Sequence, residues 1–304
     1  KIKVPAPTFC PECRRQRRLM FRNERTLYKR KCNAPDHNED MISIYSPDKP
    51  LKVYDQKYWW SDEWDPMQYG RKYDFNKSFF EQFKEFRDNF PLMSVSNSSA
   101  INSDFCNIND KSKDCYLISA SYENERSLYS NRILFSKDTI DVYLASKNEF
   151  CYELIGSHGS YKLIFSRDSE NCMESTFLYN CHNCSNCFGC ANLRGRSFCV
   201  FNEQYSKEEY NKKIRELDLG SYKNFLKTKE KFKKICDLLI RKYANIVKSV
   251  NVSGDNIITS KNCHNCFDSM ETTEDCRYSN YIGVNLKDSY DVGPGVGDAA
   301  DLLY

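Results

Sequence analysis

Ser112-Lys113-Asp114-Cys115 returns, at an offset of 24, as Ser136-Lys137-Asp138-Thr139. The words Asn124-Glu125-Arg126-Ser127 and Asn148-Glu149-Phe150-Cys151 are separated by the same offset, and they alternate with the first pair. The small fourth residue of each word, at positions 115, 127, 139 and 151, therefore recurs with a period of 12. A fixed short period indicates stacked copies of one supersecondary unit.

The same spacing continues along the chain with small shifts and with 13-residue steps near the C-terminus. Its later members are Cys172, Cys184 or Cys187, Cys199, Cys263, Cys276 and Ser289. Each unit is too short for a helix pair and is rich in residues that favour strands. Small side chains at one recurring position predict an inward ladder, and the 24-residue identity predicts two 12-residue units per coil. The alternative is an irregular α+β fold in which the similar words are coincidental.

Helical patterns flank and interrupt this array. Phenylalanines at three- and four-residue steps predict an amphipathic helix over residues 77–90, ended by Pro91, and we expect it to cap the array. Ser206-Lys207-Glu208-Glu209 is a capping box that begins a second helix, which Gly220 ends. A third helix is expected over about 222–248.

The fold class that follows is mostly β. We expect a small zinc-ribbon-like module, then a parallel β-solenoid (β-helix) with a two-helix insertion. The domain boundaries are 1–75 for a basic zinc-knuckle module of short strands and loops, 76–98 for the capping helix and linker, 99–204 for solenoid repeats, 205–250 for the helical insertion and 251–304 for further solenoid repeats.

Composition limits the class of protein. Of the 304 residues, 14% are aromatic, which favours a packed structure over disorder. The apolar runs are far shorter than the roughly 20 residues that a membrane helix needs, so we expect no membrane partner. Sixteen cysteines, many in Cys-x-x-Cys steps of a lysine-rich chain, favour the reducing cytoplasm over disulfides outside the cell.

Charge is distributed unevenly. Residues 1–31 contain eleven Lys and Arg against two acidic residues, a net of +9, so the remaining chain carries −6 of the total of +3. Arginine clusters bind phosphate and release counterions, which predicts contact with nucleic acid. The residues concerned are Arg14, Arg15, Arg17, Arg18, Arg22, Arg25, Lys29, Arg30 and Lys31. The alternative is a solvated face that docks on the acidic block Asp62–Asp65.

Cys10 and Cys13 form the strongest single motif, a knuckle suited to tetrahedral Zn²⁺. Such a site needs two more ligands, for which the chain offers Cys32 and, less surely, His37. A redox pair or free thiols remain as alternatives. The nearby tryptophans Trp59, Trp60 and Trp64 either pack within this module or stack on bases.

A second cysteine-rich run, from Cys181 to Cys190, is similar in spacing to iron–sulfur motifs. Its word Cys-His-Asn-Cys returns at Cys263–Cys266, which favours buried thiols at the corners of the array over one cluster site. Histidine is scarce and recognisable catalytic arrangements are absent from the sequence, so we expect a protein without enzymatic activity.

Several long words identify a resemblance. They are Cys10-Pro-Glu-Cys-Arg-Arg-Gln-Arg-Arg-Leu-Met-Phe-Arg-Asn-Glu-Arg25, Ile44-Tyr-Ser-Pro-Asp-Lys-Pro50, Trp59-Trp-Ser-Asp62, Cys187-Phe-Gly-Cys-Ala-Asn-Leu193 and Tyr205-Ser-Lys-Glu-Glu-Tyr210. Over essentially its whole length the chain resembles an uncharacterised zinc-ribbon-bearing family of small-genome candidate-phylum bacteria (Patescibacteria). The resemblance implies an N-terminal zinc ribbon. In that family a further Cys-x-x-Cys pair precedes the Val-Pro-x-Pro segment, and we expect that pair, outside this sequence, to compete with Cys32 and His37 as the remaining ligands.

Three functions follow as hypotheses. The first is binding of nucleic acid, RNA or a ribonucleoprotein, through the basic residues. The second is a protein-interaction scaffold that uses exposed Tyr and Asn rows of the array. The third is a carbohydrate-active β-helix enzyme, which would need an acidic pair in one groove of the array.

Overall fold

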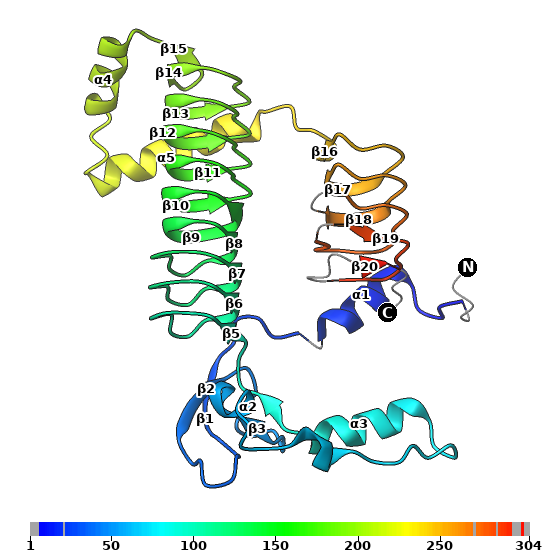
Figure 1. Cartoon of the computed structure of the whole chain (residues 1–304). Coiled ribbons are helices and arrows are strands. Elements are labelled where there is room, and N and C mark those ends of the chain that lie inside the picture. The colour runs from blue at the N-terminus through cyan, green and yellow to red at the C-terminus, as the bar shows by residue number, and fades with distance from the viewer. Residues whose placement is uncertain (1–5, 21, 270–271, 284, 294–298, 301–304) are drawn as a thin grey trace. The chain divides into compact units, whose positions relative to one another are not determined.

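The computed structural model describes residues 6–20, 22–269, 272–283, 285–293 and 299–300, and strands are its main elements (Figure 1). The chain divides into two compact units, Lys1–Asn23 with Ile240–Tyr304 and Glu24–Leu239. The expected module 1–75 is therefore split between the two units. Among the described residues, every helix is too short or too polar to span a bilayer.

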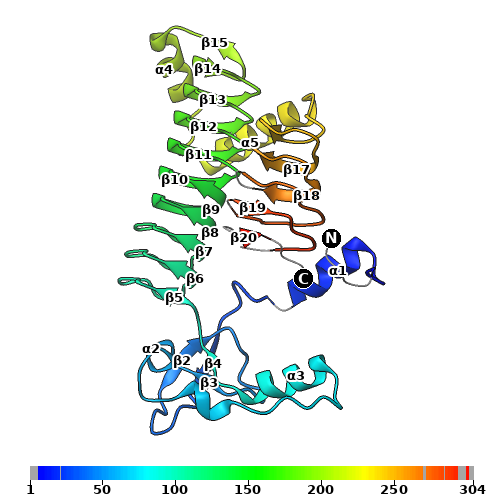
Figure 2. The ribbon, with the colours of Figure 1, turned by 45° about the vertical axis from the view of Figure 1, so that its right-hand side comes forward.

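The second unit contains one mixed sheet of eleven strands, here called the long array. Its strands are β5 (Asn97–Ser98), β6 (Asn107–Asp110), β7 (Ser119–Tyr122), β8 (Asn131–Leu134), β9 (Lys137–Ser146), β10 (Glu149–Ile155), β11 (Tyr161–Arg167), β12 (Met173–Tyr179), β13 (Ser185–Ala191), β14 (Ser197–Val200) and β15 (Glu203–Gln204). Strands β5 to β14 are parallel and stack in chain order, as Figures 1 and 2 show.

Neighbouring parallel strands pair residues at an offset of 12. Asn107 lies opposite Ser119, and Glu149 lies opposite Tyr161. The repeat from one strand to the next is thus a single 12-residue unit, and the expected repeat of two such units is wrong. The 24-residue word has a different cause, because neighbouring turns carry opposite charges at the same position. Lys137 pairs with Glu125 of the preceding turn at 3.4 Å, so the sequence repeats only after two turns.

Within each turn every third residue is buried, and a neighbouring residue has a positive φ. Ser103, Cys106 and Asn109 are 6%, 2% and 3% exposed, whereas Phe105 and Ile108 have φ values of 55° and 50°. Small side chains suit this narrow interior because they pair with the backbone of adjacent turns. The hydroxyl of Ser103 donates to Ile101 O at 2.9 Å and accepts from the N–H of Cys115 at 3.2 Å.

The small residues that the 12-residue period singled out are buried, as predicted. Cys115, Ser127, Thr139 and Cys151 are at most 2% exposed. They form one of four such columns, because residues three, six and nine positions further along are buried as well. Only this first column was apparent from the sequence.

The two ends of the long array are closed by different means. Next to β5, the side-chain amide of Gln56 in α2 (Gln56–Trp59) accepts from the N–H of Asn97 and donates to its carbonyl, both at 2.8 Å. At the other end β15 turns back antiparallel to β14, and Tyr210 of α4 (Lys207–Glu216) packs on the last turns.

Helix α3 (Phe79–Asn89) forms where the sequence predicted it, with a capping box at Ser78. The prediction that this helix caps the array is wrong, because the residues Phe79, Phe80 and Phe83 of its apolar face are 55%, 80% and 51% exposed to solvent. The small module that includes Gln56 occupies that position instead.

The helical insertion is shorter than expected. Helix α4 begins at the capping box of Ser206, as predicted, and ends at Glu216. Helix α5 (Tyr222–Asp237) ends well before the expected residue 248. Ile246 already belongs to strand β16 (Ile246–Val247).

The first unit contains the short array. Its strands are β16, β17 (Ser253–Ile258), β18 (His264–Ser269), β19 (Leu286–Lys287) and β20 (Ala299–Ala300). The offset between paired residues increases from 11 at Ile246 and Ile257 to 13 at Leu286 and Ala299, with an irregularity between Ser253 and Gly254.

The N-terminal segment is not a run of strands and loops throughout. Residues Pro11–Met20 form helix α1, in which Pro11 takes the first position and most other residues are good helix formers. The small module of the second unit follows, with β1 (Tyr28–Lys31) antiparallel to β2 (Asp40–Ser43) and β3 (Val53–Tyr54) parallel to β4 (Leu92–Met93). A short 3-10 helix, η1 (Pro66–Tyr69), completes it.

Trp59 and Trp64 pack against the core of this module, which favours the structural interpretation for both. Trp60 is 67% exposed.

Candidate functional site

Two of the predicted nucleic-acid-binding arginines clamp one buried carboxylate inside the first unit. Arg14 Nε lies 2.5 Å from Asp291 Oδ2, and Arg18 Nη1 lies 3.1 Å from Asp291 Oδ1. The Arg14 guanidinium also lies over the rings of Tyr278 and Tyr290. Burial alone would lower the pKa of Arg14, but the ion pair with Asp291 raises it overall. Both side chains are thus occupied in holding α1 on the short array.

A third arginine of the set is part of the module's interior. Arg30 is 8% exposed, and its guanidinium donates to Leu51 O, Ser46 O and the side chain of Asn33. Burial lowers its pKa. Arg18 and Arg30 therefore do not present their charge to solvent as the sequence analysis expected.

The other basic residues differ in exposure. Arg15 and Arg22 are half-buried, whereas Arg17, Arg25, Lys29 and Lys31 are exposed. Lys29 and Lys31 lie on either side of Asp40, each at 3.0 Å, and their ammonium groups lower the pKa of that carboxyl. Since Arg14 to Arg22 belong to one unit and Arg25 to Lys31 to the other, neither unit alone contains the expected patch.

The predicted zinc ligands are divided in the same way. Cys10 and Cys13 are exposed at the start of α1, and Cys13 N–H donates to Cys10 Sγ at 3.4 Å, which lowers the pKa of Cys10. Cys32 is buried in the other unit, where its sulfur accepts from the N–H groups of Ala34 and Asp55. The part of the chain that the structure describes contains no group of three side chains placed to bind a metal. Cys10 and Cys13 thus fit half of a zinc site.

The run from Cys181 to Cys190 supplies all four inward positions of a single turn. Cys181, Cys184, Cys187 and Cys190 are at most 1% exposed. Their thiols donate to backbone carbonyls, as Cys181 does to Cys190 O at 3.5 Å, and burial raises the pKa of Cys181 to about 12. Buried thiols that already donate hydrogen bonds to the backbone favour the interpretation of this run as interior packing.

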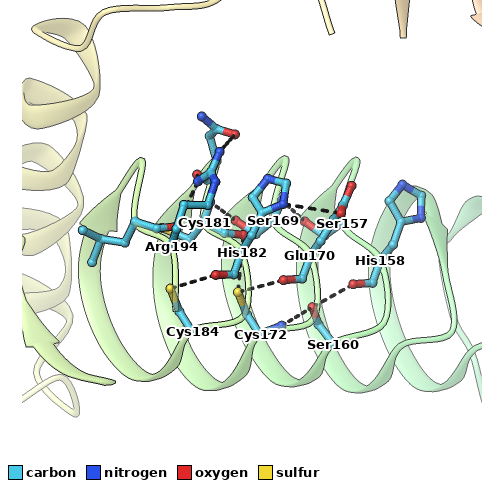
Figure 3. A network of polar contacts seen from close by, with 12 residues as sticks. Ser157, His158, Ser160, Ser169, Glu170, Cys172, Cys181, His182, Cys184 and Arg194 are labelled. Carbon is cyan, nitrogen blue, oxygen red and sulfur yellow. Dashed lines mark hydrogen bonds and ion pairs between the residues drawn. The ribbon is translucent and has the colours of Figure 1, made fainter. Parts of the chain in front are cut away.

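A ladder of polar side chains follows one corner of this turn and of the turns before it (Figure 3). Ser146 Oγ lies 3.0 Å from His158 Nδ1, and Glu170 Oε2 lies 3.4 Å from His182 Nδ1. Burial lowers the pKa of His158. The carboxylate contacts the second histidine and the hydroxyl contacts the first, so this is not the order of a catalytic triad.

One side of the long array carries mostly apolar residues in every turn, and we call it the aromatic face. It consists of two adjacent residues from each turn, from Asp104-Phe105, Tyr116-Leu117, Leu128-Tyr129, Ile140-Asp141 and Tyr152-Glu153 to Ile164-Phe165, Thr176-Phe177, Phe188-Gly189 and Val200-Phe201. Rings of neighbouring turns are in contact, for example Phe165 with Phe177 at 5.0 Å between centroids.

Helices of the insertion cover the later turns of this face, here called the covered half (residues 164–201). Phe225 of α5 packs on Phe165, and Phe232 packs on Phe177. Tyr210 of α4 belongs to the same apolar cluster. In Figures 1 and 2, α5 crosses the array at these turns and α4 lies beside β14.

The earlier turns, here called the open half (residues 104–153), are not covered to the same extent. Tyr116, Tyr129 and Tyr152 are 38%, 55% and 39% exposed, and Phe105 is 40% exposed. Sequence analysis anticipated exposed Tyr rows but did not locate this face. The signal was an apolar residue directly after the inward one in most turns, visible only once the 12-residue register was fixed.

Comparisons with known proteins add no relative to this description. A scan against protein-family models finds none that matches the chain, and a search of curated proteins finds no similar sequence.

Proposed function

We propose that this protein is a protein-interaction scaffold, and that its binding surface is the open half of the aromatic face. The observation that supports it is a difference in side-chain exposure between the two halves of this face. Where α5 covers the face, Phe177 is 2% exposed, whereas Tyr129 is 55% exposed where nothing equivalent packs among the described residues. Aromatic side chains grouped on a rigid exposed surface are typical of protein-binding sites.

Co-purification from the producing organism tests this function. Wild-type chain would be compared with the double variant Tyr116→Lys and Tyr129→Lys, and with the control Phe150→Lys, which alters an equally exposed ring outside the face. Protein partners that the control keeps and the double variant loses are the expected result. Identical partners in all three samples would overturn the proposal.

Nucleic-acid binding is a second candidate, supported by the exposed side chains of Arg17, Lys29 and Lys31. Affinity for RNA should fall steeply between low and moderate salt if phosphate contacts dominate. The triple change of these residues to Ala should weaken binding across sequences. Unchanged binding, or a weak salt dependence, would contradict this function.

For the fold, we propose that the long array is a parallel β-solenoid with one 12-residue unit per turn. The constant offset of 12 and the four buried columns support it. Because charge alternates between turns, removing residues 124–147, two whole turns, should leave a folded chain. Removing residues 124–141, one and a half turns, should unfold it. Equal circular dichroism melting curves for the two deletions would contradict the proposal.

We also propose that Cys10 and Cys13 supply two ligands of a Zn²⁺ site. Their exposure and the N–H···S contact of Cys13 support this. Elemental analysis of the full-length protein should find about one zinc per chain. Cys13→Ser should remove it and the interior control Cys115→Ser should not, whereas equal metal contents would count against the knuckle.

A reducing cytoplasmic location is a further part of this proposal. All sixteen cysteines are free thiols. Those of the interior donate hydrogen bonds, as Cys172 does to Cys181 O at 3.4 Å, and a disulfide would remove that donor. Protein denatured in acid directly after cell lysis should therefore contain close to sixteen reactive thiols, and a much lower number would contradict the location.

A further inference from the structure

The covered half shows how this face binds a helix. Phe225 and Phe232 of α5 are seven positions apart, two helical turns, so they lie on one side of the helix. Phe225 contacts Phe165 at 5.1 Å and Phe177 at 5.9 Å, and Phe232 contacts Phe177 at 5.6 Å. The face thus accepts aromatic residues from an amphipathic helix.

The open half continues the same surface without a break at the boundary. Tyr152 contacts Phe165, which lies under α5, at 5.4 Å between ring centroids. Further along, Tyr116 contacts Phe105 at 5.5 Å and Tyr129 at 5.8 Å. Its five turns span four strand spacings, about 19 Å, which exceeds the ~10 Å diameter of a helix, so a helix that crosses the array as α5 does fits on it.

Charge decides what kind of helix fits. The eighteen positions of the aromatic face include Asp104, Asp141 and Glu153 but neither Lys nor Arg. Where the two halves meet, a lysine of α5 already pairs with one of these carboxylates, since Lys229 Nζ lies 3.7 Å from Glu153 Oε1. Two copies of the open half placed against each other would bring these carboxylates together, which disfavours self-association through this face.

From the α5 contacts and this charge we infer that the open half binds a lysine-rich amphipathic helix of a partner protein in the way that the covered half binds α5. This inference rests on the proposed scaffold function. Aromatic or aliphatic residues at three-, four- and seven-residue steps would pack on Tyr116, Tyr129 and Tyr152. Lysines beside them would pair with Asp104 and Asp141, since Glu153 is already paired with Lys229.

The chain's own α5 sequence supplies a defined probe. A labelled peptide of Tyr222–Asp237, with Cys236→Ser, would be titrated with the full-length protein and followed by fluorescence anisotropy. We expect the double variant Tyr116→Lys and Tyr129→Lys to bind about tenfold more weakly, since two central apolar contacts are lost and positive charge is added. The control Phe150→Lys should bind as the wild type does.

A second peptide with its lysines changed to Glu should lose binding to the wild-type protein. The inference is overturned if the α5 peptide does not bind, or if it binds all protein variants equally, because it then displaces the resident α5 or binds elsewhere. It is also overturned if the wild type is a dimer by sedimentation that the double variant dissociates, since the occupant is then a second copy.

The outcomes of the two experiments separate the inference from the function on which it rests. If the peptide fails but the double variant loses its cellular partners, the scaffold function stands and the helix is wrong. If the peptide binds as expected while the double variant keeps every partner, the helix site stands and the scaffold function fails.

Discussion

The long array and the short array are built from similar sequences but differ in how regular their stacking is. In the long array every parallel pair keeps an offset of 12, from Asn97 and Asn109 to Ser185 and Ser197. In the short array the offset changes from 11 to 13. In the regular long array, inward hydroxyl groups repeatedly accept a hydrogen bond from a backbone N–H of the next turn.

The short array depends on features that the long array does not need. Gly254 and Gly293 have φ values of 135° and 143°, where L residues are strained. A Cβ at Gly254 would meet the carbonyl of Cys266 in the next strand, and a Cβ at Gly293 would meet the carbonyl of Asn280, 13 residues earlier. In the long array, positive φ values stay near 50°, which Asn, Asp and even Lys adopt. In the short array, where the offset between paired residues varies, stability thus depends on single residues such as these glycines. In the long array, where the offset is constant, it is distributed over many residues.

The largest expected effect comes from a methyl group at Gly254. In Gly254→Ala the new Cβ would overlap the carbonyl of Cys266, so the strand must shift, and we expect a loss of roughly 4 kcal/mol or more. The matched change in the long array, Gly195→Ala, has a φ of 59° and open space around it, and should cost about 1 kcal/mol. Urea unfolding of both variants measures the difference, and similar midpoints would remove the contrast between the arrays.

The next effect concerns buried and exposed ion pairs. Asp291→Asn leaves the nearly buried guanidiniums of Arg14 and Arg18 without their carboxylate, so we expect a loss of about 3 kcal/mol and release of α1. In the long array Asp138→Asn removes a pair with Arg126, whose side chain is 43% exposed, and should cost less than about 1 kcal/mol. Trypsin cleavage within residues 14–18 reports the release of α1. Equal protection in the two variants would contradict the assignment.

The smallest expected effect is a pH dependence at His158. Burial lowers its pKa in the folded chain, so protonation favours the unfolded chain. The stability that neutral His158 contributes is complete above its ordinary pKa of about 6.5 and is lost as the pH falls from there toward the lowered value. His158→Gln should reduce this loss between pH 7 and 5, measured by thermal unfolding. An equal reduction in His264→Gln of the short array would show that the effect is not specific to His158.

Much of the fold could be predicted from the sequence because the interior is repetitive. The 12-residue period, the buried column at Cys115 and Ser127, and the helices beginning after Ser78 and Ser206 are all as expected. The 24-residue coil was wrong because the repeated words contain outward charges, and their alternation reflects pairing between turns rather than the path of one turn.

The candidate sites were less predictable because they depend on contacts between distant segments. Arg14 and Arg18 have the composition of a phosphate-binding cluster, and nothing near them in sequence indicates that Asp291 lies against them. The aromatic face could not be recognised from the sequence for a related reason. It takes only two adjacent residues from each turn of the array, and α5 packs on its covered half, a contact that only the tertiary structure reveals.

The Gln56 amide described at one end of the long array has a consequence for polymerisation. A stack of parallel strands ends in unpaired backbone groups that can template another chain, as in amyloid growth. The Gln56 side chain hydrogen-bonds to the backbone N–H and carbonyl of Asn97 in the first strand, β5. At the other end, the antiparallel strand β15 pairs with the last parallel strand, β14. With both growing ends terminated by the chain itself, end-to-end fibre formation should require displacement of the module that carries Gln56.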